Sequence, residues 1–147
     1  MIFMHLIVGI ILGKIFGNYT LFIIGSMFPD LDHIYIILKN KLLSIKMIIE
    51  TLRFEDKFGI KYKTPFFHSV FGLILFSLAA YLLNNEFIVP FGVSYLLHLL
   101  IDWLDIDEKY YLYPLKIKFK GFLPIGSRAE QILTLIAIIV VFLLYLI

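Results

Sequence analysis

The residues best suited to chemistry form one short run, Pro29-Asp30-Leu31-Asp32-His33, inside a long apolar segment. Residues 20–28 before the run and 34–38 after it are almost entirely apolar. A charged side chain at the centre of a membrane helix costs roughly 2.5–3.5 kcal/mol on insertion scales, so such groups usually face a bundle interior and mark a site. Carboxylate oxygens and imidazole nitrogens bind zinc, manganese or iron. The run therefore predicts a metal site; the alternative is a helix end at which Pro29 breaks the helix and both aspartates are solvated.

The remaining histidines favour the metal site. His98 and Asp102 are four residues apart and Asp30 and His33 are three apart, so each pair lies on one face of a helix. Asp32 then points elsewhere, toward a second ion or toward an imidazole that it orients. The full set of predicted ligands is His5, Asp30, Asp32, His33, His68, His98, Asp102 and Glu130. These groups can serve two or three divalent ions, of which zinc is expected and manganese or iron are alternatives.

The elements that must position these groups are predicted to be membrane helices. The 147 residues suggest one domain, and 61% of them are hydrophobic, with a mean hydropathy of +0.96. Only 16% are charged, against a usual ~25%. The absence of cysteine excludes disulfides and thiolate metal sites, so any ion is held by His, Asp and Glu. The net charge of +2 is too small to indicate a nucleic-acid partner.

Five apolar segments are expected to form helices, and they comprise residues 1–16, 20–38, 66–83, 87–104 and 129–147. Because a span needs ~20 residues, the last four are long enough and the first is short. His5, Gly9 and Gly13 share one face of the first segment, along which a partner helix can approach closely. His68 and Ser69 fall in the first turn of the third segment. The predicted fold is an all-α, polytopic membrane bundle with about five membrane-embedded helices and short interfacial helices or loops on the cytoplasmic side.

The distribution of basic residues predicts the orientation. Twelve of the thirteen Lys and Arg lie in 39–63 and 109–128, so the positive-inside rule places both stretches in the cytoplasm. A two-span hairpin that turns at Asn84-Asn85 connects them, which puts the N-terminus inside and the C-terminus outside. All four histidines then lie in the inner layer of an inner-membrane protein, and the site faces the cytoplasm.

The stretch 39–63 has its own pattern. Apolar residues recur at helical spacing at Leu42, Ile45, Ile48, Ile49 and Leu52. This pattern predicts an amphipathic helix, which either lies on the membrane surface or covers the bundle as a solvated helix.

The order of the motifs is similar to that of a known family. The motifs are Gly25-Ser26-Met27-Phe28-Pro29-Asp30-Leu31-Asp32-His33, His68-Ser69, His98-Leu99-Leu100-Ile101-Asp102, Tyr113-Pro114-Leu115, and Gly126-Ser127 before Glu130. Over nearly the whole chain they resemble the YdjM-like family, described as inner-membrane-associated metal-dependent hydrolases. More distantly, the set is similar to the helical zinc-dependent phospholipase C and P1 nuclease group, whose three-metal sites use an Asp, several His and a His-x-x-x-Asp pair. The chain departs from the expected pattern before His68, where Pro65-Phe66-Phe67 separates the histidine from the nearest basic residue, Lys63.

Three functions are compatible with these residues. The first is metal-dependent hydrolysis of a phosphoester, with a lipid head group as the expected substrate and Asp32 or Asp102 as the catalytic carboxylate that orients or deprotonates water. Basic residues at the inner interface would attract the anionic head group, and these are Lys63, Lys116, Lys118 and Arg128. The second function is cation handling or transport without chemistry. The third is a scaffold with a structural metal, which recruits a cytoplasmic protein partner through 39–63 or 105–128.

Geometry discriminates between these functions. A shared metal requires the imidazoles of His68 and His98 to lie within about 8 Å of one another, because Zn–N distances are near 2.0–2.1 Å. Both imidazoles should lie close to Asp30 and Asp102. His5 and Glu130 should lie at the edges of the site. Of the three functions, only the hydrolase requires a cavity the size of a head group beside an open coordination position.

Overall fold

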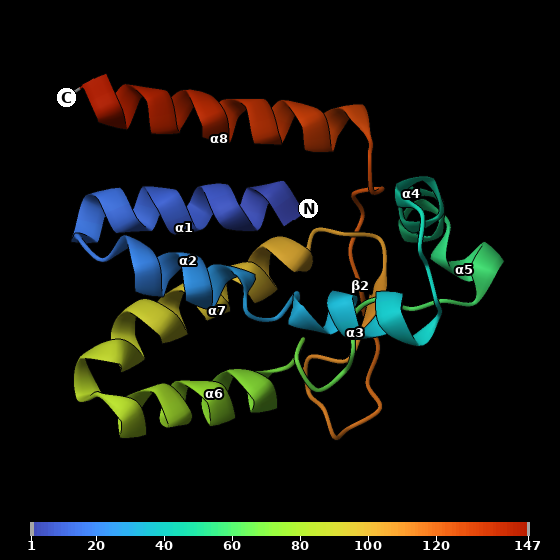
Figure 1. Cartoon of the computed structure of the whole chain (residues 1–147), viewed down its shortest axis with the longest axis horizontal. Helices are drawn as coiled ribbons and strands as arrows, with labels where there is room; N and C mark the ends of the chain where they lie inside the picture. Colours follow the sequence, from blue (N-terminus) through green and yellow to red (C-terminus); the bar gives the residue numbers. More distant parts are fainter. Residues whose placement is uncertain (1, 147) are drawn as a thin grey trace.

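The computed structural model describes residues 2–146, which are mostly helical (Figure 1). Its elements are α1 (Ile2–Phe16), α2 (Tyr19–Met27), α3 (Leu31–Lys39), α4 (Ile45–Arg53), α5 (Glu55–Phe58), α6 (Val70–Leu83), the 3₁₀ helix η1 (Asn85–Phe87), α7 (Ile88–Asp102), β1 (Glu108–Lys109), β2 (Phe119–Lys120) and α8 (Arg128–Leu146). β1 and β2 form a short antiparallel pair in the second polar stretch. The prediction of a helical chain is confirmed, and this hairpin corrects its all-α description.

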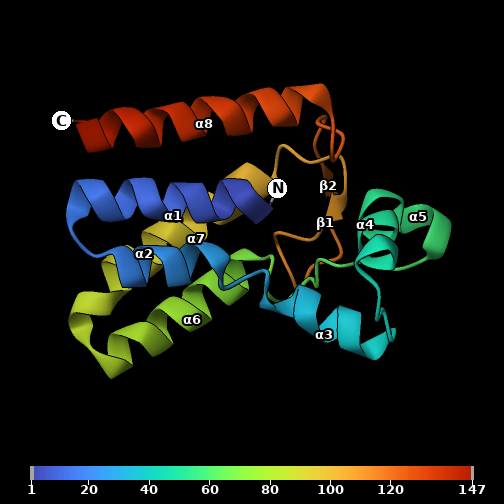
Figure 2. The same cartoon turned by 45° about the horizontal axis from the view of Figure 1, so that its top comes forward.

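The apolar helices run back and forth along one axis. α8 packs on α1, α1 packs on α2, and α7 packs against both α2 and α6. The turn after α1, η1 and the end of α8 lie at one end of the bundle, whereas α3, α4, α5 and the hairpin gather at the other (Figures 1 and 2). Both basic stretches thus lie at the same end, as their charge predicts. Their cytoplasmic location stays a prediction, and the predicted outer end at Ile147 lies outside the described residues.

Pro29 divides the second apolar segment into two helices. α2 ends at Met27 and α3 begins at Leu31, and the two are bent by 43°. Proline lacks the N–H that would continue the helical ladder, and its ring clashes with the carbonyl one turn earlier. The break is short, because the Phe28 N–H still donates to the Ile24 carbonyl and the Asp30 N–H donates to the Met27 carbonyl. The carboxylates therefore lie at a break inside the bundle, between two apolar helices.

Small residues bring α1, α2 and α7 into close contact. A Cβ on Gly9 would lie 2.9 Å from the Ile23 Cα, and a Cβ on Gly25 would lie 2.9 Å from the Phe91 Cα. Both positions therefore require glycine, since a side chain there would push the helices apart. The predicted close approach along the His5–Gly9–Gly13 face is confirmed, and His5 is buried on it.

The helices are shorter than the apolar segments. Among the described residues, α8 is long and apolar enough to cross a membrane alone, and α2 with α3 qualifies as one bent span. α6 has 14 residues and α7 has 15, or about 21–23 Å at 1.5 Å per residue, against a hydrocarbon core of ~30 Å. The prediction that these two segments are long enough to span a membrane is therefore wrong, because the helices that they form are too short. α6 starts late because the Ser69 side chain caps it at the Gly72 N–H, which leaves His68 in the preceding turn and not in the first helical turn.

The predicted amphipathic helix in 39–63 is confirmed as α4. Its inner side joins a small core of Ile36, Leu42 and Tyr62, on which Ile48 and Leu52 pack. Other apolar side chains of the same region are exposed, namely Leu43, Ile45 and Ile49. One side of α4 therefore covers the protein, while these side chains remain available to a membrane surface.

Candidate metal centre

The predicted ligands come together from several parts of the chain. His5 comes from the first turns of α1, Asp30 from the α2–α3 break, Asp32 from the first turn of α3, His68 from the turn before α6, and Asp102 from the end of α7. These side chains are buried, as are His33 and His98. Isolated ionisable groups are strongly disfavoured in such surroundings, so the cluster must be internally compensated.

His98 is fixed by the close packing of α2 on α7. Its Nδ1 donates to the Ser26 carbonyl over 2.7 Å, and Ser26 follows the glycine at which the two helices touch. A histidine that donates one ring N–H in this way offers the other nitrogen as a ligand. The lone pair of His98 Nε2 therefore faces the cluster.

Three donor atoms at the centre of the cluster have the spacing of a single coordination shell, and a fourth, Asp30 Oδ1, lies beside two of them. His68 Nε2 lies 3.4 Å from His98 Nε2 and 3.4 Å from Asp102 Oδ2, and His98 Nε2 lies 3.5 Å from the same oxygen. Asp30 Oδ1 lies 3.8 Å from each of the two nitrogens. Two ligands bound at 2.0–2.1 Å and at a tetrahedral angle are about 3.3–3.4 Å apart. The distances match that value for three donors, with Asp30 slightly further out.

Asp32 supports this set from outside. Its Oδ2 accepts hydrogen bonds from the Thr64 N–H at 2.7 Å and hydroxyl at 2.8 Å, and lies 3.2 Å from His68 Nδ1. Its Oδ1 lies 2.9 Å from His33 Nδ1. A carboxylate against the far nitrogen of an imidazole orients the ring and raises its basicity as a ligand. Of the two predicted roles for Asp32, its contacts favour the orientation of imidazoles.

The structure places the side chains of His33 and His5 differently from the prediction. His33 Nδ1 lies 3.4 Å from Asp30 but closer to Asp32, so it contacts the carboxylates and stands outside the four-atom set. His5 was expected at the edge, yet its ring stacks on His98 at 3.7 Å and its Nε2 lies 3.2 Å from Asp102 Oδ1. The register of α1 on α2, fixed by Gly9, carries His5 to the centre. His5, His98 and Asp102 thus form a second triad that could hold an ion.

Glu130 lies near the edge of the site, as expected. Its carboxylate accepts the Gly126 N–H at the start of α8, and the side chain is half-buried. It lines a cavity of about 190 Å³ together with Asp30, His33 and Asp102. Among the pockets of the described residues, this cavity is the one that reaches the buried aspartates and histidines of the cluster.

The donor chemistry of the cluster fits a divalent cation. Asp30 Oδ2 and Asp102 Oδ2 are buried and lack hydrogen-bond partners, and so does His5 Nδ1. A cation would satisfy such oxygens, since a buried acceptor without a partner costs about 1–3 kcal/mol. Imidazole nitrogens with carboxylate oxygens are common zinc ligands, and manganese or iron accept the same atoms with more ligands.

The whole chain matches one family. A family model described as YdjM inner membrane protein matches residues 1–147. The chain belongs to this YdjM family. The match confirms the resemblance seen in the motifs and identifies the chain as one of a family of inner membrane proteins. No curated protein and no solved structure matches it.

Lys63, expected among the basic residues that attract a head group, instead lies against the carboxylates of the cluster. Lys63 Nζ donates to Asp102 Oδ1 at 3.0 Å and to Asp105 Oδ2 at 2.6 Å, and lies 3.8 Å from Asp107. Burial lowers the pKa of Lys63, but Asp102 and Asp105 outweigh burial and raise it, so the ammonium stays charged. The nearest sequence signal is its place five residues before His68, where a basic residue was expected closer to the histidine.

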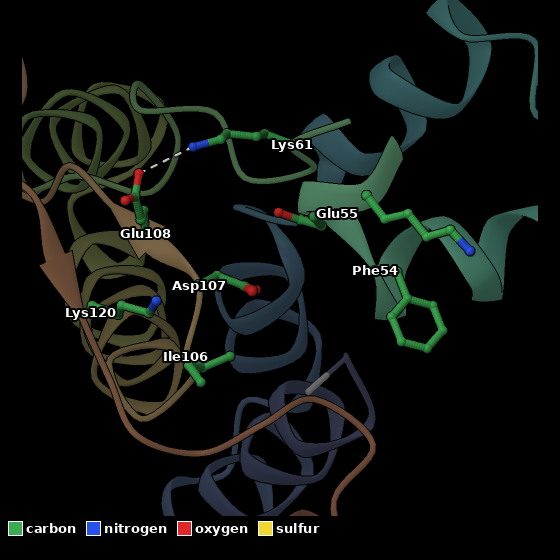
Figure 3. Close-up of a pocket in the computed structure, with 8 residues that line it drawn as sticks. Phe54, Glu55, Lys61, Ile106, Asp107, Glu108 and Lys120 are labelled. Carbon is green, nitrogen blue, oxygen red and sulfur yellow. Dashed lines mark hydrogen bonds and ion pairs between the residues drawn. The ribbon is translucent and has the colours of Figure 1, made fainter. Parts of the chain in front are cut away.

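A second pocket adjoins the cavity of this YdjM site. It has a volume of about 350 Å³ and shares Glu55 and Asp107 with the first cavity. Figure 3 shows both carboxylates pointing toward its centre, near the Lys61–Glu108 ion pair of 3.3 Å. Burial and then Asp107 raise the pKa of Glu55 to about 7. These two shared carboxylates therefore lie between the outer pocket and the cavity beside the predicted ligands.

Proposed function

We propose that the chain is a membrane-embedded metal-dependent hydrolase that cleaves a phosphoester, with a lipid head group at the cytoplasmic face as its substrate. The observation that carries this proposal is the cavity of about 190 Å³ beside the buried His and Asp cluster. Asp30 and Asp102 both line it, so an ion held by the imidazoles would be reached from the cavity. A purely structural centre has no need of that access.

The number of ions follows from His98. Two triads need this histidine, one with His5 and Asp102 and the other with Asp30 and His68. Since His98 Nδ1 is already bonded to the Ser26 carbonyl, only Nε2 is available, and one lone pair binds one ion. We therefore assign a single ion, preferably zinc, to His68, His98 and Asp102, in place of the two or three expected from the ligand count.

The three buried carboxylates, Asp30, Asp32 and Asp102, are assigned different roles. When bound, a divalent ion supplies a water of lowered pKa and polarises the phosphoryl oxygen. Asp30, whose Oδ1 lies 3.8 Å from both imidazole nitrogens, would accept a proton from that water. As the water oxygen bonds to phosphorus the ester P–O bond would break, and the proton held by Asp30 would pass to the oxygen of the leaving alcohol. Asp32 has both oxygens engaged by His33, His68 and Thr64, so we assign it a positioning role, and Asp102 the role of ligand.

The membrane placement is part of the proposal. We propose that α1, α2, α6, α7 and α8 are embedded in the inner membrane, with the polar end of the bundle in the cytoplasm. The short α6 and α7 then reach only part of the way through the bilayer, which leaves the metal centre near the inner head groups. Basic side chains at this end, including Lys116 and Lys118, favour an anionic lipid surface.

A structural centre is the second candidate function. Its support is that the described cluster holds two triads of protein donors, so that protein groups alone could fill much of a coordination shell. In that case the metal would stabilise a scaffold that recruits a cytoplasmic protein partner through the polar stretches. Cation transport is favoured less, because the described cluster lies at one end of the bundle and not along a path through it.

The deciding experiment is metal analysis of the purified full chain, combined with hydrolysis of a panel of phosphoesters presented in mixed micelles and vesicles. The expected result is bound metal and release of phosphate or head group, which chelation abolishes and added zinc restores. His68→Ala should abolish both, whereas Glu86→Gln, at the opposite end of the bundle, should leave both intact. Bound metal without hydrolysis of any panel member would favour the scaffold.

A further inference from the structure

Asp102 has its two oxygens in different surroundings. Oδ2 faces His68 and His98, where an ion is assigned, and Oδ1 faces His5 Nε2 at 3.2 Å and Lys63 Nζ at 3.0 Å. In two-metal phosphoesterases a shared group commonly separates two cations that lie ~3.5–4 Å apart. Asp102 therefore has the position of a bridging carboxylate, and Lys63 stands on the side where a second cation would be found.

The surroundings of Lys63 have the make-up of a cation site. Three carboxylates approach its ammonium, those of Asp102, Asp105 and Asp107, and the lysine side chain is only 10% exposed. Asp105 is fully buried, and its Oδ1 has no hydrogen-bond partner. Without a positive charge at this point, several carboxylates would be left close together in low dielectric, which is strongly unfavourable.

The backbone that presents these carboxylates is itself fixed. Lys109 Nζ donates to the carbonyls of Asp105 and Asp107, at 2.6 and 3.0 Å. The Gly121 N–H donates to the Asp105 carbonyl, and a Cβ on Gly121 would lie 2.5 Å from that oxygen, so only glycine fits. The carboxylates are thus held in place for the ammonium.

We propose that the Lys63 ammonium is the built-in second cation of the centre, so that the site operates with one metal ion and one lysine. This inference rests on the proposed function. Lys63 lines the same cavity as Asp30 and Asp102, and its remaining hydrogen-bonding capacity can bind a second oxygen of the phosphoryl group. In this arrangement the lysine excludes a second divalent ion by occupying its place.

The test counts ions per chain. Untagged full chain in detergent is saturated with zinc, unbound zinc is removed, and the bound metal is measured by mass spectrometry. The wild type should hold one ion, and His98→Ala should hold none, which assigns the counted ion to this centre. Lys63→Met leaves Asp102, Asp105 and His5 without the ammonium and should hold two ions. Lys63→Arg should stay at one ion, as should Lys61→Met, the matched change at an exposed lysine two residues away.

The outcomes separate this inference from the proposed function. A wild type that holds two or more ions removed by His98→Ala and Asp105→Asn would overturn the role of Lys63 and keep the metal centre. A folded Lys63→Met that still holds one ion would also overturn it. A wild type that holds no zinc, manganese or iron would overturn the metal centre and this inference together. Where Lys63→Met does not fold, the wild-type count still tests the inference, because two or more ions at this centre would overturn it.

Discussion

His68 and His98 present their Nε2 atoms to one another across 3.4 Å, although 30 residues separate them in the chain. Two imidazoles held this close, each with a nitrogen facing the other and Asp102 Oδ2 within 3.5 Å of both, form a chelating pocket. The distance is well inside the 8 Å limit that the sequence analysis set for a shared ion. It supports the metal centre, and the following predictions test it.

Ligands and orienting groups should differ in their effect on zinc affinity. His68→Ala and His98→Ala remove donor atoms and should abolish measurable binding in competition with a chromophoric chelator. His33→Ala removes contacts to Asp32 and Asp30, and Thr64→Val removes one contact to Asp32, so each should weaken binding by about 10–100-fold. Thr64→Val is the milder change, because the backbone N–H of residue 64 still donates to Asp32. If His33→Ala were as severe as His68→Ala, His33 would be a ligand.

Chelation should destabilise the protein. A ligand present at 1,000 times its Kd stabilises the folded state by about 4.1 kcal/mol. For a chain of this size, each kcal/mol corresponds to roughly 2–4 °C in Tm, so chelation should lower Tm by about 8 °C or more. Asp102→Asn should have a lower Tm than wild type and respond little to chelator, whereas Glu86→Gln should respond like wild type. A wild type indifferent to chelation would count against a bound metal.

The orientation can be tested by labelling. Cysteines introduced at Asn40 and Lys118 are exposed and lie at the polar end of the bundle, whereas one at Asn85 is exposed at the opposite end. In intact cells an impermeant thiol reagent should label Asn85→Cys only, and permeabilisation should expose the other two. Labelling of Lys118→Cys but not of Asn85→Cys would invert the proposed topology.

The sequence predicted the parts of the fold and site that depend on periodicity. His98 and Asp102 face one ion because they are four residues apart on α7, and His5 is buried because it shares a face with Gly9. Periodicity could not show that a serine cap begins α6 after His68. A helix break at Pro29 was expected only together with solvated aspartates, whereas the structure combines the break with buried aspartates. These outcomes depend on local hydrogen bonds that compete with helix extension.

Contacts from irregular segments were beyond prediction for a physical reason. Lys63 meets Asp105 across 42 residues, and Thr64 meets Asp32 across 32. Neither Lys63 nor Thr64 belongs to a helix, so no spacing rule relates them to their partners. His5 was predicted at the edge of the site. Its actual depth depends on how far α1 is shifted along α2, which is set by side-chain packing between the helices and not by the hydrophobic pattern of α1.

The last prediction concerns Glu55, which faces Asp107 where the two pockets meet. Burial and then Asp107 raise its pKa from the ordinary 4.5 to about 7, against the opposing effects of the Tyr62 N–H, Lys63 and His33. The folded protein therefore binds a proton that the unfolded chain releases between these values. Stability from this group is complete below about pH 4.5 and is lost as the pH rises toward 7.

Glu55→Gln should remove this loss of folding stability at higher pH. The variant keeps an oxygen to accept the Tyr62 N–H, which Glu55 accepts at 3.1 Å, but it carries no charge at any pH. Because the site is partly solvated, the gain at pH 8 over pH 5 should be about 1 kcal/mol relative to wild type, or roughly 2–4 °C in Tm. Thermal unfolding of the zinc-loaded wild type and variant across this range measures it. The expected result is two curves that meet at pH 5 and diverge as the pH rises, with the variant more stable at pH 8. Parallel curves would mean that Glu55 ionises in the folded protein as it does in the unfolded chain, and that the two pockets meet at an ordinary solvated carboxylate.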